Sequence, residues 1–106
     1  THNVSELEEI YDQIVYLEKG NILFNLKKKD IIKDFRVIRS DSETLSLMKD
    51  NIIGIDHYKR YSEALVNIGE SDEIRALLRS ADYHKIKNPD IEDLIHYYQE
   101  GGVLNV

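Results

Sequence analysis

The feature that most constrains this chain is the spacing of residues that start and stop helices. The five glycines and one proline stand singly between short apolar stretches, apart from the terminal pair Gly101 and Gly102. Glycine readily adopts the left-handed conformation that follows helices, and proline is tolerated in their first turn. The 106 residues are therefore divided into short segments, each of a length that suits one helix.

The best-marked helix is predicted over residues 5–20. Ser5, followed three residues later by Glu8, forms a capping-box pattern, and Gly20 supplies the stop. Between them, apolar residues recur at the spacing of three and four that places them on one helical face. These residues are Leu7, Ile10, Tyr11, Ile14 and Leu17.

The remaining segments are predicted in the same way. The stretch 21–39 leaves two interpretations open, because Ile22, Leu23 and Phe24 suit a strand by themselves, whereas residues 31–38 favour a second helix broken near residues 27–30. Four more helices follow, opened by the capping cluster at residues 40–42 and then by Asp56, Ser71 and Asn88–Pro89. We therefore predict an all-α fold, a compact bundle of five to six short helices, as a single domain over residues 1–106.

Composition limits the function. Fourteen Lys and Arg residues stand against 20 Asp and Glu residues, and the net charge of −6 argues against nonspecific nucleic-acid binding over the whole surface. The same charge favours a protein partner with a basic surface. The absence of cysteine fits a reducing, cytoplasmic location, and no apolar stretch approaches the length of a membrane span.

One basic patch stands out on the second predicted helix. Lys29, Lys33 and Arg36 follow one another at spacings of four and three, so they share a helical face. Such a patch would dock an acidic protein or RNA. The alternative is a solvated face that Asp30 and Asp34 partly neutralise, and the absence of interleaved aromatic residues favours this second interpretation.

Metal and catalytic sites are not predicted. Asp93 and His96 stand three residues apart on the last helix, but a metal needs three or four ligands and the other histidines, His57 and His84, are distant in sequence. No nucleophile elbow and no phosphate-binding glycine loop occurs. We expect no metal and no other cofactor.

One short segment carries a resemblance. Arg79-Ser80-Ala81-Asp82-Tyr83-His84 resembles the signature of HEPN domains, small helical bundles in which an Arg is followed some four residues later by a His, with an Arg-x-Ala-Asp-Tyr variant. The resemblance implies metal-independent RNA cleavage, with Arg79, Asp82 and His84 in the site. His84 would act as base or acid and Arg79 would stabilise the phosphorane. The alternative is a surface pair between Arg79 and Asp82.

The leading hypothesis is a protein-interaction module without catalytic activity, which inhibits, neutralises or adapts a larger partner; a HEPN-like ribonuclease or a degenerate RNA-binding relative ranks second. Acidic faces on the first and last helices would steer a basic partner, and tyrosines would contribute contact area. A homodimer is left open. The predicted partner-binding residues are Glu6, Glu9, Asp12, Tyr58, Tyr61, Asp90, Asp93 and Tyr97.

Overall fold

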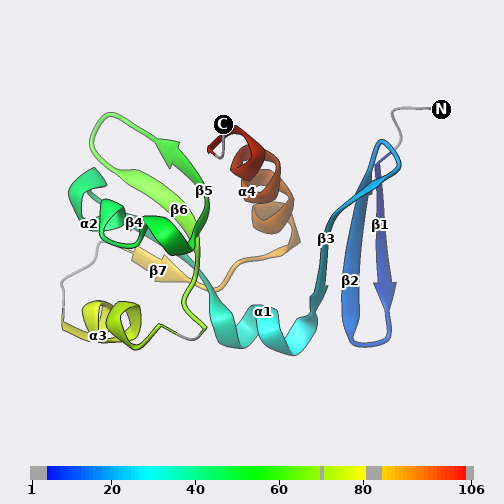
Figure 1. Cartoon of the computed structure of the whole chain (residues 1–106), viewed down its shortest axis with the longest axis horizontal. Coiled ribbons are helices and arrows are strands. Elements are labelled where there is room, and N and C mark those ends of the chain that lie inside the picture. Colours follow the sequence, from blue (N-terminus) through cyan, green and yellow to red (C-terminus); the bar gives the residue numbers. More distant parts are fainter. Residues whose placement is uncertain (1–4, 70, 81–84, 105–106) are drawn as a thin grey trace.

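The structure is a computed structural model that describes residues 5–69, 71–80 and 85–104, and it shows a mixed fold in which strands predominate. The predicted all-α bundle is therefore wrong. Within the described residues, seven strands form a three-stranded and a four-stranded antiparallel sheet, accompanied by four short α-helices (Figure 1).

The three-stranded sheet occupies the segment that was predicted as the first helix and the start of the second. It is a meander of β1 (Ser5–Ile10), β2 (Gln13–Glu18) and β3 (Asn21–Lys27). Two-residue turns join these strands, and Lys19 and Gly20 both have positive φ angles, of 53° and 82°. That pair of angles is what a type I′ hairpin turn requires, so Gly20 reverses a strand and does not stop a helix.

The four-stranded sheet follows a helix that connects the two parts. Its strands lie in the order β5-β6-β4-β7, and every neighbouring pair is antiparallel. Two helices connect these strands in the sequence β-α-β-β-α-β, which is the split βαβ, or ferredoxin-like, topology. The elements after β3 are α1 (Lys28–Asp34), β4 (Phe35–Ser40), α2 (Ser42–Ser46), the 3-10 turn η1 (Lys49–Asn51), β5 (Ile52–His57), β6 (Ser62–Asn67), α3 (Asp72–Ser80), β7 (Lys85–Lys87) and α4 (Ile91–Leu104).

Two apolar cores hold the layers together. One face of the four-stranded sheet packs Ile38, Ala64 and Val66 against residues of α2 and α3, such as Leu45 and Ile74. The opposite face packs against α4, which lies between the two sheets (Figure 1).

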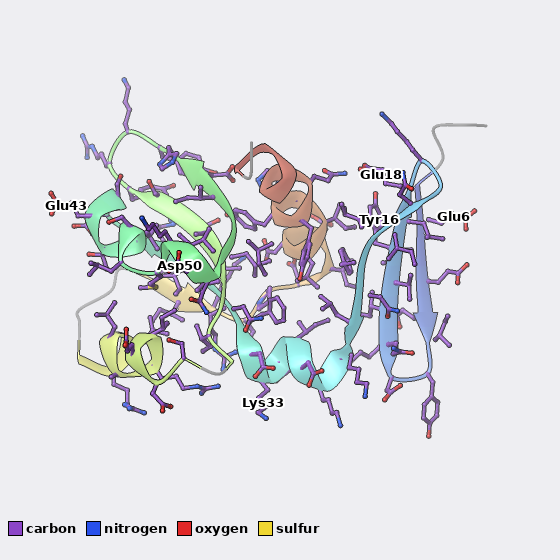
Figure 2. All side chains as sticks on the ribbon, viewed as in Figure 1. Glu6, Tyr16, Glu18, Lys33, Glu43 and Asp50 are labelled. Atoms are coloured by element: carbon purple, nitrogen blue, oxygen red, sulfur yellow. The ribbon has the colours of Figure 1, made fainter. Side chains whose placement is uncertain are left out.

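The second core is shared by both sheets. It joins Tyr16 and Phe24 of the three-stranded sheet, Leu94 and Tyr97 of α4, and Leu65 of β6. Figure 2 shows Tyr16 on the side of its sheet that faces α4, whereas Glu6 points away from the body of the molecule. Burial at alternate positions of β2 explains why this segment forms a strand.

Some predicted helix starts are confirmed. Asp41 accepts a hydrogen bond from the Thr44 backbone N–H at 3.0 Å and caps α2, and the Ser71 hydroxyl accepts one from the Ile74 N–H at 3.2 Å at the start of α3. The helix predicted between Asp56 and Gly69 is wrong, because this segment forms the hairpin of β5 and β6. The third predicted helix, which was expected to run from the capping cluster to Gly54, is too long, since α2 ends at Ser46 and β5 begins at Ile52.

Candidate functional site

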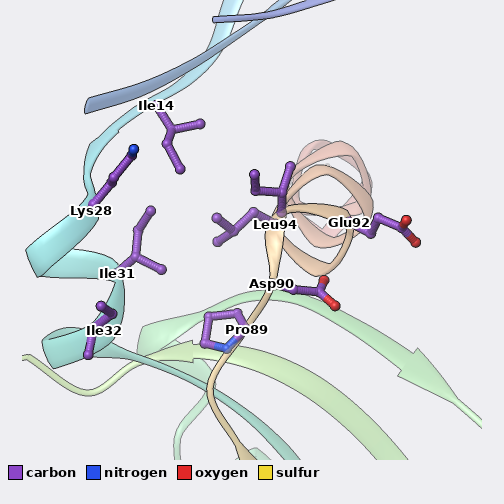
Figure 3. A pocket seen from close by; sticks show the side chains of 9 residues that line it. Ile14, Lys28, Ile31, Ile32, Pro89, Asp90, Glu92 and Leu94 are labelled. Carbon is purple, nitrogen blue, oxygen red and sulfur yellow. The ribbon is translucent and has the colours of Figure 1, made fainter. Parts of the chain in front are cut away.

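An apolar groove of about 510 Å³ lies where the three-stranded sheet, α1 and the start of α4 meet (Figure 3). Its apolar walls come from all three elements. The lining residues are Ile14, Lys28, Ile31, Ile32, Pro89, Asp90, Ile91, Glu92 and Leu94.

Two neighbouring isoleucines of α1 differ in their surroundings at the groove. Ile31 belongs to the shared core, whereas Ile32 is 63% exposed and lines the groove beside it. Ile14 and Leu94 form the floor and are buried. An open apolar surface that continues a core in this way is typical of a binding site.

Lysines lie along the α1 side of the groove. Lys28 lines it and forms an ion pair of 3.1 Å with Glu9 of β1. Lys29 stands three residues before Ile32, and residues at that spacing are neighbours on a helix surface. Lys29 and Lys33 are exposed, and Figure 2 shows Lys33 pointing away from the molecule.

Two acidic residues stand on the α4 side of the groove, and Figure 3 shows their carboxylates directed away from α1. Asp90 and Glu92 line the groove, and Asp90 also caps the helix. The Asp90 carboxylate accepts a hydrogen bond from the Asp93 N–H at 2.8 Å, and the Asp93 carboxylate accepts one from the Asp90 N–H at 3.1 Å. Asp93 also forms an ion pair of 3.2 Å with Lys87. Asp90 and Asp93 thus stabilise the start of α4, while Glu92 is exposed.

The predicted acidic face of the first helix lies instead on the β1 hairpin. Glu6 and Glu9 belong to β1, an edge strand, and Asp12 belongs to the turn that follows. Charged side chains on an edge strand hinder pairing with another chain. Glu9 and Asp12 lie near one end of the groove, because Glu9 contacts Lys28 and the Asp12 carbonyl accepts a hydrogen bond from the Lys28 N–H at 2.8 Å.

The predicted basic patch is divided between two elements. Lys29 and Lys33 are one turn apart on α1, but Arg36 belongs to β4. The Arg36 guanidinium donates hydrogen bonds of 2.7 Å to the carbonyls of Ile32 and Phe35. It therefore stabilises the junction between α1 and β4.

The predicted tyrosines have different surroundings. Tyr58 and Tyr61 flank the turn between β5 and β6, with ring centroids 4.9 Å apart. Tyr97 lies in the core with 1% of its surface exposed, and its hydroxyl donates a hydrogen bond of 2.8 Å to Glu63. Burial, and then this hydrogen bond, raise the pKa of Tyr97 far above its ordinary value.

The HEPN resemblance loses its structural basis. It implied a helical bundle, and the fold is a mixed one. Arg79 is exposed in the last turn of α3, whereas Asp82 and His84 lie outside the described residues.

One serine and one histidine lie within hydrogen-bond distance of each other, but the serine is buried. His57 Nδ1 lies 2.8 Å from Ser62 Oγ, but Ser62 is only 1% exposed, so a substrate does not reach its hydroxyl. His96 Nε2 lies 2.6 Å from Asp56 Oδ2 and joins α4 to β5. No group of three or more candidate metal ligands occurs within the described residues.

The prediction missed the residues that meet across the four-stranded sheet. Arg39 of β4 forms two hydrogen bonds with Glu63 of β6, from Nε at 3.2 Å and from Nη2 at 3.0 Å. Lys85 of β7 pairs with Arg39 in the strand register. Only the strand pairing brings these residues together, so helical periodicity gave no signal for them.

Comparison with protein-family models, curated proteins and solved structures found no match to this chain. Within the described residues, no helix has both the length and the apolar character needed to cross a membrane. The structure therefore defines the class of protein: a small mixed α/β protein with an open apolar groove.

Proposed function

We propose that the chain is a protein-binding module without catalytic activity, whose groove takes an amphipathic segment of a partner protein. The observation that carries this proposal is the open apolar groove beside Ile32, with lysines on its α1 side and carboxylates on its α4 side. Burial of apolar surface supplies the binding free energy, and the charged walls supply orientation.

The two walls specify the chemistry of the partner segment. Its apolar strip lies on Ile14, Ile32 and Leu94, its basic residues lie toward Asp90 and Glu92, and its acidic residues lie toward the lysines of α1. The net charge predicted a partner with a basic surface. In this proposal only one side of the partner segment is basic. Opposite charges on the two walls also select one direction of binding, because the reversed segment would bring like charges together.

A protein segment fits the groove better than a small apolar molecule. Small-molecule sites typically enclose most of the ligand surface. Here Ile32 is mostly exposed, and the charged walls stand beside the apolar strip rather than over it. Packing an amphipathic segment into an open groove between elements is a recurrent mode of peptide recognition.

Peptide selection on the intact chain tests the proposal. A displayed random-peptide library is selected against the wild-type protein, with an Ile32→Glu variant as the counter-selection target. We expect peptides with apolar residues at helical or alternating spacing, flanked by Lys or Arg on one side and Asp or Glu on the other. Their affinity for Ile32→Glu should fall at least about tenfold, because a carboxylate in the groove is desolvated by the bound peptide.

A matched substitution controls for surface hydrophobicity. Leu47 is 71% exposed at the end of α2 and does not line the groove, so Leu47→Glu should leave peptide affinity unchanged. Selection of no peptide, or equal losses in the two variants, would overturn the proposal. Saturable binding of a fatty acid in the absence of peptide binding would also overturn it, since the site would then be one for small apolar molecules.

A further inference from the structure

A gradient of charge crosses the four-stranded sheet along one row of paired residues. The strand register aligns Asp56 of β5 with Glu63 of β6, Glu63 with Arg39 of β4, and Arg39 with Lys85 of β7. Side chains at directly paired positions of neighbouring strands lie on the same face of a sheet. The row therefore runs from two carboxylates at one edge to two cations at the other.

Helix α4 engages the acidic half of this row. It packs mainly on β5, where His96 contacts Asp56, and the adjacent Tyr97 donates its hydrogen bond to Glu63. Both carboxylates are thus occupied by protein groups. The cationic half of the row, on β4 and β7, borders a hollow.

That hollow measures about 480 Å³. Four residues line it, and we call them the cationic corner: Arg39, Arg60, Tyr61 and Lys85. A smaller recess of about 130 Å³ shares Arg39 and Lys85 with it and adds Val37, Glu63 and Lys87. In the part of the chain that the structure describes, neither Arg60 nor Lys85 has an acidic partner within ion-pair distance. Within the described residues, Arg60 and Lys85 thus line the hollow without a carboxylate partner.

The corner also holds an ordered guanidinium and aromatic rings. The Arg39 guanidinium carbon lies 4.4 Å from the centroid of the Tyr61 ring, and Glu63 holds its Nε and Nη2 groups. Among the described residues its Nη1 group has no hydrogen-bond partner, so it remains able to donate to a ligand. Tyr58, which is half exposed, lies against Tyr61 and extends the aromatic surface.

We propose that the cationic corner binds a phosphorylated nucleoside, either free or as a unit of single-stranded nucleic acid. The phosphate contacts Arg39, Arg60 and Lys85, since guanidinium and ammonium groups are the side chains that bind phosphate oxygens. The base stacks on the tyrosine rings, because every base has an aromatic face. The volume falls in the range of small-ligand sites, and the net charge of −6 argues against phosphate binding over the whole surface.

Binding measurements on the full chain test this site with two probes. Fluorescence anisotropy with a labelled oligouridylate decamer measures binding to a strand, and calorimetry with uridine monophosphate measures binding of a free nucleotide. Arg60→Ala combined with Lys85→Ala should weaken binding of whichever probe binds by at least about tenfold. For the decamer, the slope of log affinity against log salt should fall in magnitude by about 1.4, since each phosphate contact to a single strand contributes roughly 0.7.

A second double variant provides the control. Lys27→Ala combined with Lys49→Ala removes the same charge from exposed positions outside the corner and should leave affinity unchanged. Preference for the decamer would identify a strand as the ligand, and equal binding of both probes would identify a nucleotide. The proposal is overturned if neither probe binds saturably at physiological salt, if both double variants lose affinity equally, or if inorganic phosphate competes as well as the nucleotide.

Discussion

The side chain of Tyr97 connects α4, the helix between the two sheets, to the row of charged residues on the four-stranded sheet. Its ring is buried in the core that both sheets share, and its hydroxyl reaches Glu63, which in turn holds Arg39. A buried hydroxyl needs such a partner, because an unpaired polar group in the core is unfavourable. The same contact orders the acidic half of the charged row.

Replacing Tyr97 with Phe should lower the free energy of unfolding by about 1–3 kcal/mol, because one oxygen of Glu63 then loses its partly buried donor. Urea denaturation measures this change. Tyr98→Phe is the control, since Tyr98 is partly buried in contact with Phe24 and makes no hydrogen bond through its hydroxyl among the described residues. Equal effects of the two substitutions would contradict the role assigned to the Tyr97 hydroxyl.

Alkaline pH should destabilise the fold through the same residue. The pKa of Tyr97 is raised in the folded chain, chiefly by burial, so the phenol stays neutral at a pH where it ionises in the unfolded chain. This contribution to stability is complete below the ordinary tyrosine pKa of 10.0 and is lost as the pH rises above that value. Urea denaturation at several pH values above about 9 should show the decline, and Tyr97→Phe should make it shallower.

At the scale of elements, a close approach of two backbones sets the position of α4. Gly54 of β5 lies directly against the backbone of Tyr97, and a Cβ atom at this position would collide with the Tyr97 carbonyl. The register of β5 shifts next to this glycine, between Ile52 and Gly54. Only a residue without a side chain lets α4 pack this closely on the sheet.

Gly54→Ala should therefore displace α4 and lower the free energy of unfolding by about 1–3 kcal/mol, the usual effect of overpacking. Chemical denaturation measures the loss, and near-ultraviolet circular dichroism reports the altered packing of Tyr97 and Tyr98. Gly20→Ala is the control, because Gly20 has a positive φ but no atom near the added methyl. Its substitution should lower stability without changing the aromatic signal, and an unchanged signal in Gly54→Ala would contradict the account.

The elements also show how far the sequence can predict this fold. Capping signals are local, so Asp41 and Ser71 correctly marked the starts of α2 and α3. Positive φ is ambiguous, since Gly20 suits both the end of a helix and a hairpin turn. The apolar residues of 5–20 fit a helical spacing as well as the alternation that buries Ile14 and Tyr16, and the pairing with β3 decides between them.

At the scale of the whole molecule, the two proposed sites are both products of tertiary structure. The groove brings together β2, α1 and α4, which are far apart in the sequence, and the cationic corner depends on the register of β4, β6 and β7. Residues 29–33 and 90–93 carried recognisable charge patterns, but the apolar groove between them had no counterpart in those patterns. The sequence therefore predicted some of the charged residues beside the groove but not the groove itself.

Methyl-resolved NMR of the chain with a selected peptide tests the central claim most directly. With isoleucine and leucine methyl groups labelled, the groove proposal predicts that peptide shifts the signals of Ile14, Ile32, Ile91 and Leu94. It predicts no shift for Leu47 or Ile86, which are exposed and lie outside the groove. Saturable shifts confined to the groove would support the claim. Shifts centred on Ile86 in β7, or spread evenly over the exposed methyl groups, would contradict it.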